Sequence, residues 1–151
     1  DNMILKRMKR RHNADDVRNF VQRCRSLRKD ITFGADIIAG FPTETEEMFY
    51  NTYKLLKECK ISHLHIFPFS PKENTPAARM PQLQKSIIKQ RAQKLRQLGE
   101  ELLDEVKKEF YLPRKILIEE VKTGAVVGYD QNYIKHRIPM IGLPIGEIVT
   151  A

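Results

Sequence analysis

The chain has 151 residues, of which 41% are hydrophobic and 30% are charged, and its formal net charge is +8. This length can bury one hydrophobic core with a small second module, and it excludes two domains of ordinary size. Because no apolar run is long enough to cross a bilayer, we expect a cytoplasmic protein without a membrane segment.

The positive charge is concentrated in two segments. Residues 1–30 hold ten basic and four acidic side chains, and residues 84–115 hold nine and five. Such an excess favours a polyanionic partner such as nucleic acid, because Lys and Arg release counterions from phosphate groups. Solvated helix faces would explain the same charges without any partner, so both interpretations stay open.

Two cysteines, Cys24 and Cys59, are far apart and fall within segments that we expect to be helical. Their spacing matches neither a disulfide framework nor a set of metal ligands. We expect both to be small apolar core residues of a protein in a reducing compartment.

The first predicted elements are a helix and a buried strand. Asn13, followed by two aspartates, predicts the start of a helix that ends near Lys29. Residues 31–41 are almost continuously apolar, which is typical of a strand covered on both faces in a parallel sheet. Alternation assigns Gly34, Asp36, Ile38 and Gly40 to a face open to a lumen, and Ala35, Ile37 and Ala39 to a face against helices.

A second helix, a second strand and a long helix follow. Thr43 and Glu46 predict a capping box at the start of the second helix. Residues 63–69 form the next apolar strand, and residues 84–110 carry the spacing of a long helix. Two parallel strands would leave sheet edges unpaired, so we expect this part to be the end of a larger barrel.

Beyond Pro113 the pattern changes to short strand candidates at residues 115–121, 125–133 and 145–150, separated by glycines. Such a pattern is typical of a small antiparallel barrel. We therefore place a domain boundary after residue 112.

Three segments in a fixed order carry a family resemblance. They are LKRMKR at residues 5–10, DIIAGFPTETEEMF at residues 36–49 and FPFSPKENTPAA at residues 67–78. Together they resemble the radical S-adenosylmethionine tRNA methylthiotransferases, and most closely the branch that modifies threonylcarbamoyl-adenosine beside the anticodon. Lys72 and Asn74 depart from the Arg and Gly that the family usually has.

The resemblance implies an α/β fold in two parts. Residues 1–112 would be the C-terminal part of a partial radical-SAM (βα) barrel, and residues 113–151 a truncated TRAM-like β-barrel. In the intact enzyme it implies methylthiolation at C2 of threonylcarbamoyl-adenosine, with tRNA and the missing N-terminal part of the enzyme as partners. A free-standing RNA-binding module without catalysis is the alternative.

The resemblance also implies S-adenosylmethionine and 4Fe-4S iron-sulfur clusters in the intact enzyme. The family's CxxxCxxC cluster motif is absent from this chain, so we expect it to hold no cluster and to be inactive alone. We assign no catalytic residue and no metal ligand to it. His63 and His65 share a strand face, but two histidines without a third ligand make a weak metal site.

Two sets of residues are candidates for binding. By resemblance, the cofactor-binding set is Asp36, Ile38, Gly40, Phe67, Pro68 and Phe69. Asp36 is the sharpest candidate, because a carboxylate within an apolar strand needs a partner, although the whole set could simply fill a core. The nucleic-acid-binding set is Lys6, Arg7, Lys9, Arg10, Arg11, Lys122, Lys135 and Arg137, with stacking on Tyr129 or Tyr133.

Overall fold

The computed structural model describes residues 1–109, 113–139 and 142–150. These residues form two compact units, Asp1–Val106 and Lys107–Ala151. None of the described helices combines the length and the apolar composition that crossing a membrane requires.

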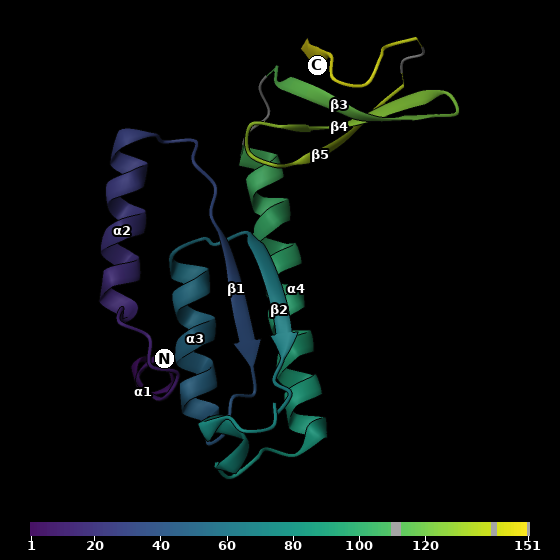
Figure 1. The fold of residues 1–151 in the computed structure, drawn as a ribbon. Coiled ribbons are helices and arrows are strands. Elements are labelled where there is room, and N and C mark those ends of the chain that lie inside the picture. Colours follow the sequence, from purple (N-terminus) through teal and green to yellow (C-terminus); the bar gives the residue numbers. More distant parts are fainter. Residues whose placement is uncertain (110–112, 140–141, 151) are drawn as a thin grey trace. The chain divides into compact units, whose positions relative to one another are not determined.

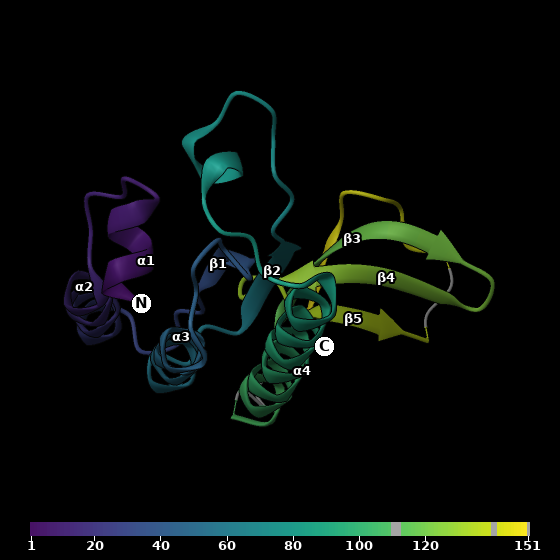
Figure 2. The ribbon, with the colours of Figure 1, turned by 90° about the horizontal axis from the view of Figure 1, so that it is seen from below.

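The first unit packs helices on a two-stranded parallel sheet (Figure 1). Strands β1 (Gly34–Ala39) and β2 (His63–Pro68) are shorter than predicted but lie where the apolar runs placed them. The helices are α1 (Asn2–Arg7), α2 (Ala14–Leu27), α3 (Glu46–Glu58) and α4 (Lys85–Glu109), with a 3-10 helix at Pro76–Arg79. Figure 2 shows α3 and α4 on one side of the sheet.

The core of this unit lies between the sheet and its helices. Ala39, Leu56 and Leu95 are at most 2% exposed and belong to one apolar cluster. Ala35 and Ile37 pack against the same cluster. The predicted alternation is therefore confirmed within β1, with its odd-numbered side chains facing the helices. The assignment of Gly40 to the lumen face is wrong, because Gly40 lies beyond the strand and is buried against Ile88 of α4.

The starts of the helices show what local sequence determines. Asn13 caps α2 as predicted, in a capping box in which its side chain and that of Asp16 each accept a backbone N–H. The predicted cap of α3 at Thr43 is wrong. Thr43 has a left-handed backbone, with φ at 67°, and α3 begins after Thr45, whose hydroxyl accepts the Met48 N–H.

The second unit is a four-stranded antiparallel sheet with strand order β5-β4-β3-β6. Its strands are β3 (Lys115–Lys122), β4 (Ala125–Asp130), β5 (Lys135–Ile138) and β6 (Ile148–Thr150). The predicted strand 125–133 is too long, because the chain turns after Asp130 and returns as β5, which the sequence did not indicate. The predicted boundary at residue 112 lies outside the described residues.

One face of this sheet is a small apolar core. Ile116, Ile118 and Val126 are at most 1% exposed, and Ile138 and Val149 pack against them. A Cβ at Gly128 would collide with the Leu117 carbonyl, so the close approach of β4 to β3 requires glycine there.

Candidate functional site

The face of the β1–β2 sheet opposite the helices carries the predicted lumen side chains. The register pairs Gly34 with His63, Asp36 with His65 and Ile38 with Phe67. Asp36 and His65 are exposed, Phe67 is 53% exposed and Ile38 is half-buried. The desolvation argument for Asp36 therefore does not hold within this chain, because its carboxylate reaches water.

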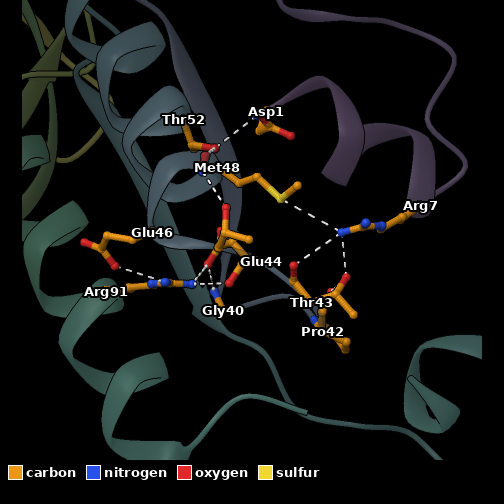
Figure 3. Close-up of polar contacts among 11 residues, drawn as sticks. Asp1, Arg7, Gly40, Pro42, Thr43, Glu44, Glu46, Met48, Thr52 and Arg91 are labelled. Atoms are coloured by element: carbon orange, nitrogen blue, oxygen red, sulfur yellow. Dashed lines mark hydrogen bonds and ion pairs between the residues drawn. The ribbon is translucent and has the colours of Figure 1, made fainter. Parts of the chain in front are cut away.

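The chain leaves β1 through a tight loop that Glu44 organises from within (Figure 3). One oxygen of Glu44, Oε2, accepts the Gly40 N–H at 3.1 Å and the Arg91 Nη1 at 2.7 Å. Arg91, on α4, also donates to the Glu44 carbonyl at 2.9 Å and to Glu46 at 3.0 Å. Arg91 thus binds both the backbone carbonyl and the side-chain carboxylate of Glu44, and so holds the loop in one conformation.

The Glu44–Arg91 pair is almost completely buried, with the two side chains 4% and 7% exposed. Burial raises the pKa of Glu44 because it disfavours the carboxylate, and the Arg91 guanidinium and the Gly40 N–H oppose that rise. The guanidinium also lies over the Phe49 ring, 5.3 Å from its centroid.

The sequence did not identify Glu44 and Arg91 as a pair. A signal was present, since Arg91 stands at a position that follows the apolar spacing of the long helix. A charged residue in such a stripe requires a buried partner, and 47 residues separate Arg91 from this one.

Gly40 is buried at the start of this loop, and the structure explains why it is glycine. Its φ is 75°, and an added Cβ would come within 2.7 Å of the Ile88 side chain. Phe69 follows β2 and meets Phe41 edge to face with centroids 5.4 Å apart, and Pro68 is exposed. The cofactor-binding set is thus grouped around the carboxyl ends of two adjacent strands.

Arg7 reaches the same loop from α1. Its Nη1 donates to the Thr43 hydroxyl at 2.7 Å and to the Thr43 carbonyl at 3.3 Å, and the Met48 sulfur is 3.9 Å away (Figure 3). The other basic residues of this cluster, Lys6, Lys9, Arg10 and Arg11, are exposed. Arg7 therefore supports the loop, and phosphate binding by the cluster stays a prediction.

The basic residues predicted in the second unit have different surroundings. Lys122 pairs with Glu120 at 2.8 Å, whereas Lys135 lies over the Tyr129 ring, 5.9 Å from its centroid. Arg137 is exposed on β5.

A buried carboxylate holds the turn between β4 and β5. Asp130 has no exposed side-chain surface, and it accepts hydrogen bonds from Arg114 at 2.6 Å and from the Asn132 and Ile134 N–H groups. His136 lies 3.1 Å from the same carboxylate. Burial would raise the pKa of Asp130, but these hydrogen bonds outweigh it and lower the pKa below its ordinary value.

The described residues contain no cluster of three or more His, Cys, Asp or Glu side chains that could hold a metal ion. Cys24 is half-buried and Cys59 is buried, and burial raises the pKa of the Cys59 thiol. Two separated thiols of this kind do not fit the three-cysteine ligation of an iron-sulfur cluster.

Comparison with known proteins gives relatives that match nearly the whole chain, although no family model matches it. The threonylcarbamoyladenosine tRNA methylthiotransferase MtaB of Rickettsia prowazekii is 48% identical over 100% of the chain and 35% of its own length. The enzyme of the same name from Bacillus subtilis is 33% identical over 98% of the chain and 34% of its own length.

A second branch matches less of the chain. The tRNA-2-methylthio-N(6)-dimethylallyladenosine synthase of Aquifex aeolicus is 34% identical over 84% of the chain and 29% of its own length. The chain thus spans about a third of the length of the curated relatives that it matches. Over that extent, the chain is similar to proteins named threonylcarbamoyladenosine tRNA methylthiotransferases.

Proposed function

We propose that the chain is the C-terminal segment of a cytoplasmic enzyme that methylthiolates C2 of threonylcarbamoyl-adenosine in tRNA. The observation that carries this proposal is the 48% identity to the Rickettsia prowazekii enzyme over 100% of the chain. In this proposal residues 1–112 complete a partial radical-SAM barrel, and residues 113–151 form a TRAM-like barrel that binds tRNA.

The open face of β1 and β2 would supply one wall of the S-adenosylmethionine pocket. Ile38 and Phe67 are neighbours across the strands and leave apolar surface uncovered, which fits a stacked adenine. Asp36, exposed beside them, can accept a hydrogen bond from a ligand N–H or O–H group. The backbone of Phe67, Pro68 and Phe69 would border the adenine edge, and the Gly40 loop would close the pocket.

The residues of this chain do not fit an iron-sulfur cluster, so the proposal assigns its ligands to the rest of the enzyme. Such a cluster, held outside this chain, would supply the electron for radical chemistry on S-adenosylmethionine. Within this chain, Glu44 and Arg91 hold the loop in shape, and α3 and α4 exclude water from behind the strands.

Substitution at the strand face tests the pocket. The chain would replace the matching third of the Bacillus subtilis enzyme, and the chimera would carry Ile38→Ala or Asp36→Ala. We expect each change to raise the KM for S-adenosylmethionine with little effect on the KM for tRNA. Leu27→Ala, at an 83% exposed side chain on α2, is the control. An unchanged KM for S-adenosylmethionine in both variants would contradict the pocket.

The alternative is an RNA-binding module without catalysis, favoured by the net charge of +8. Complementation separates the two functions in a strain that lacks the methylthio modification. We expect the chain alone not to restore the modified nucleoside, whereas a full-length relative does. Restoration by the chain alone would show that it is catalytically complete.

Binding to tRNA tests what both functions share. The affinity should fall steeply with salt, and replacing Lys6, Lys9, Arg10 and Arg11 with Gln should reduce the slope, because each neutralised phosphate releases counterions. Absence of binding at low salt would remove the RNA-binding role of this chain.

A further inference from the structure

One row of side chains across the second unit's sheet presents apolar surface to water. The register places Lys135 beside Tyr129, Tyr129 beside Leu117, and Leu117 beside Ile148, one residue from each strand. Leu117 is 42% exposed and Ile148 is 62% exposed, while alternate residues point to the apolar core on the opposite face. Apolar side chains exposed side by side in this way fit a surface that contacts a partner.

Tyr133 extends this row from the turn between β4 and β5. Its side chain is 72% exposed, and its ring centroid lies 5.2 Å from that of Tyr129, with the planes inclined by 34°. Its backbone is left-handed, with φ at 62°, a conformation that costs energy for a bulky residue. Because the ring is mostly exposed, its burial contributes little that would offset this cost.

Hydrogen bonds to Asp130 hold the turn around Tyr133. The Tyr133 N–H donates to the Asp130 carbonyl at 2.9 Å, and the Asn132 and Ile134 N–H groups donate to the Asp130 carboxylate at 2.8 and 3.0 Å. Arg114, just before β3, donates to the same carboxylate. The backbone that carries the ring is therefore fixed by hydrogen bonds before any partner binds, which lowers the entropy cost of association.

Positive charge surrounds the two rings. Lys135 lies over Tyr129, and strand alternation puts Lys115 and Arg137 on the same face. Among the described residues, neither Lys115 nor Arg137 has an ion-pair partner, whereas Glu120 is neutralised by Lys122. Neighbouring aromatic rings beside cations without an ion-pair partner among the described residues complement a nucleobase and its phosphate rather than an apolar protein surface.

We propose that this face binds an unpaired nucleotide of RNA, with its base stacked on Tyr133 and its phosphate held by Lys135 and Arg137. The proposal rests on the proposed function, in which the second unit contacts tRNA. It adds the site and the mode of binding, because stacking without hydrogen bonds to base edges accepts any base and requires a nucleotide outside a duplex.

The chain offers a matched control in α3. Tyr50 stacks on Tyr53 with planes 10° apart, and Lys54 lies over the Tyr50 ring at 5.2 Å. Arg18, Lys57, Asp1 and Glu58 line the same surface, so its cations stand among carboxylates. It therefore has the same residue types in a mixed-charge setting.

The test measures binding of the 151-residue chain to a fluorescent single-stranded RNA of about eight nucleotides, to its duplex and to a tRNA transcript. Tyr133→Asn keeps a residue that tolerates the left-handed backbone and removes the ring. We expect it to weaken single-strand binding about tenfold, the value of one stacked base, without changing the salt slope. Tyr133→Phe should bind like the parent chain, and Tyr50→Ala should have little effect.

For Lys135→Ala we expect a change in salt dependence instead. The slope of log affinity against log salt concentration should be smaller by about 0.7 for each phosphate that the variant no longer neutralises. Equal single-strand affinities of the parent chain and Tyr133→Asn, with tRNA binding intact, would overturn this site and leave the proposed function standing. Equal affinities for single strand and duplex would also overturn it. Failure of the parent chain to bind any of the RNAs at low salt would overturn this site together with the RNA-binding role of this chain. The thermal unfolding of each variant shows that it is folded.

Discussion

Replacing Arg91 with Met tests the buried ion pair that shapes the loop after β1. The guanidinium makes three hydrogen bonds of 2.7 to 3.0 Å, two of them to Glu44 and one to Glu46. Methionine preserves much of the apolar stem and removes the charge. Glu44 then stays buried, with only the Gly40 N–H as a described hydrogen-bond partner.

The loss of stability should be large. Removing one member of a buried pair costs about 3–5 kcal/mol, because the remaining charge is desolvated without compensation. Glu46 adds little, since its side chain is 72% exposed. For a chain of this size, a cost of about 3 kcal/mol corresponds to a fall in Tm of about 6–12 °C.

The effect should depend on pH in a defined direction. Burial raises the pKa of Glu44, and Arg91 opposes the rise, so Arg91→Met raises that pKa further. A carboxyl group whose pKa is raised in the folded state stabilises the fold fully at pH values below its ordinary pKa of 4.5. This stabilisation is lost as the pH rises through the folded-state pKa. The deficit of the variant should therefore be smallest in acid and grow toward neutral pH.

Urea unfolding followed by circular dichroism measures both effects. Arg18→Met is the matched control, because Arg18 pairs with Asp15 and Glu58 at the surface, where a pair is worth at most about 1 kcal/mol. If Arg91→Met costs no more than Arg18→Met at neutral pH, or if its deficit does not change with pH, the buried pair does not hold the loop.

Three further substitutions address other parts of the fold. Asp130→Asn should cost about 3–5 kcal/mol, because it breaks a buried charge network. Because the pKa of Asp130 is lowered in the folded state, the parent chain should lose stability as the pH falls through that folded-state pKa. Asp130→Asn should lose less stability over the same pH range, and unfolding at several pH values measures the two chains. Gly40→Ala should destabilise the fold for two reasons, the φ of 75° and the collision of the new Cβ with Ile88. Adding Ile88→Ala should relieve only the collision, and a double-mutant cycle of unfolding free energies measures that part. Thr45→Ala should cost about 1 kcal/mol in urea unfolding as the loss of a helix cap, and Thr45→Ser should restore most of it; equal stabilities of Thr45→Ala and the parent chain would argue against capping.

Local patterns predicted the parts of the fold that depend on a few neighbouring residues. The cap at Asn13 and the inward face of β1 need only a capping side chain and a period of two, and both are confirmed. The cap of α3 could not be located in this way, because a left-handed residue at Thr43 extends the turn beyond the first cap candidate.

Other features depend on contacts between distant segments. The pairing of Glu44 with Arg91 bridges 47 residues, and no local pattern specifies it. Strand β5 is four residues long and alternates charged with other side chains, so its strand character comes from its pairing with β4. Asp36 was expected to be desolvated because its neighbours are apolar, but its own face of the sheet is open in this chain.

The most direct test of the account exchanges this chain for the matching third of the Bacillus subtilis enzyme, which is 33% identical to it. The measurement is the amount of 2-methylthio nucleoside in tRNA hydrolysates from a deletion strain that expresses the chimera, determined by mass spectrometry. We expect the modified nucleoside to reappear, and to disappear again when the cluster cysteines of the Bacillus portion are replaced. A folded chimera with its cluster assembled that leaves the nucleoside unmodified would contradict the assignment of this chain to that enzyme.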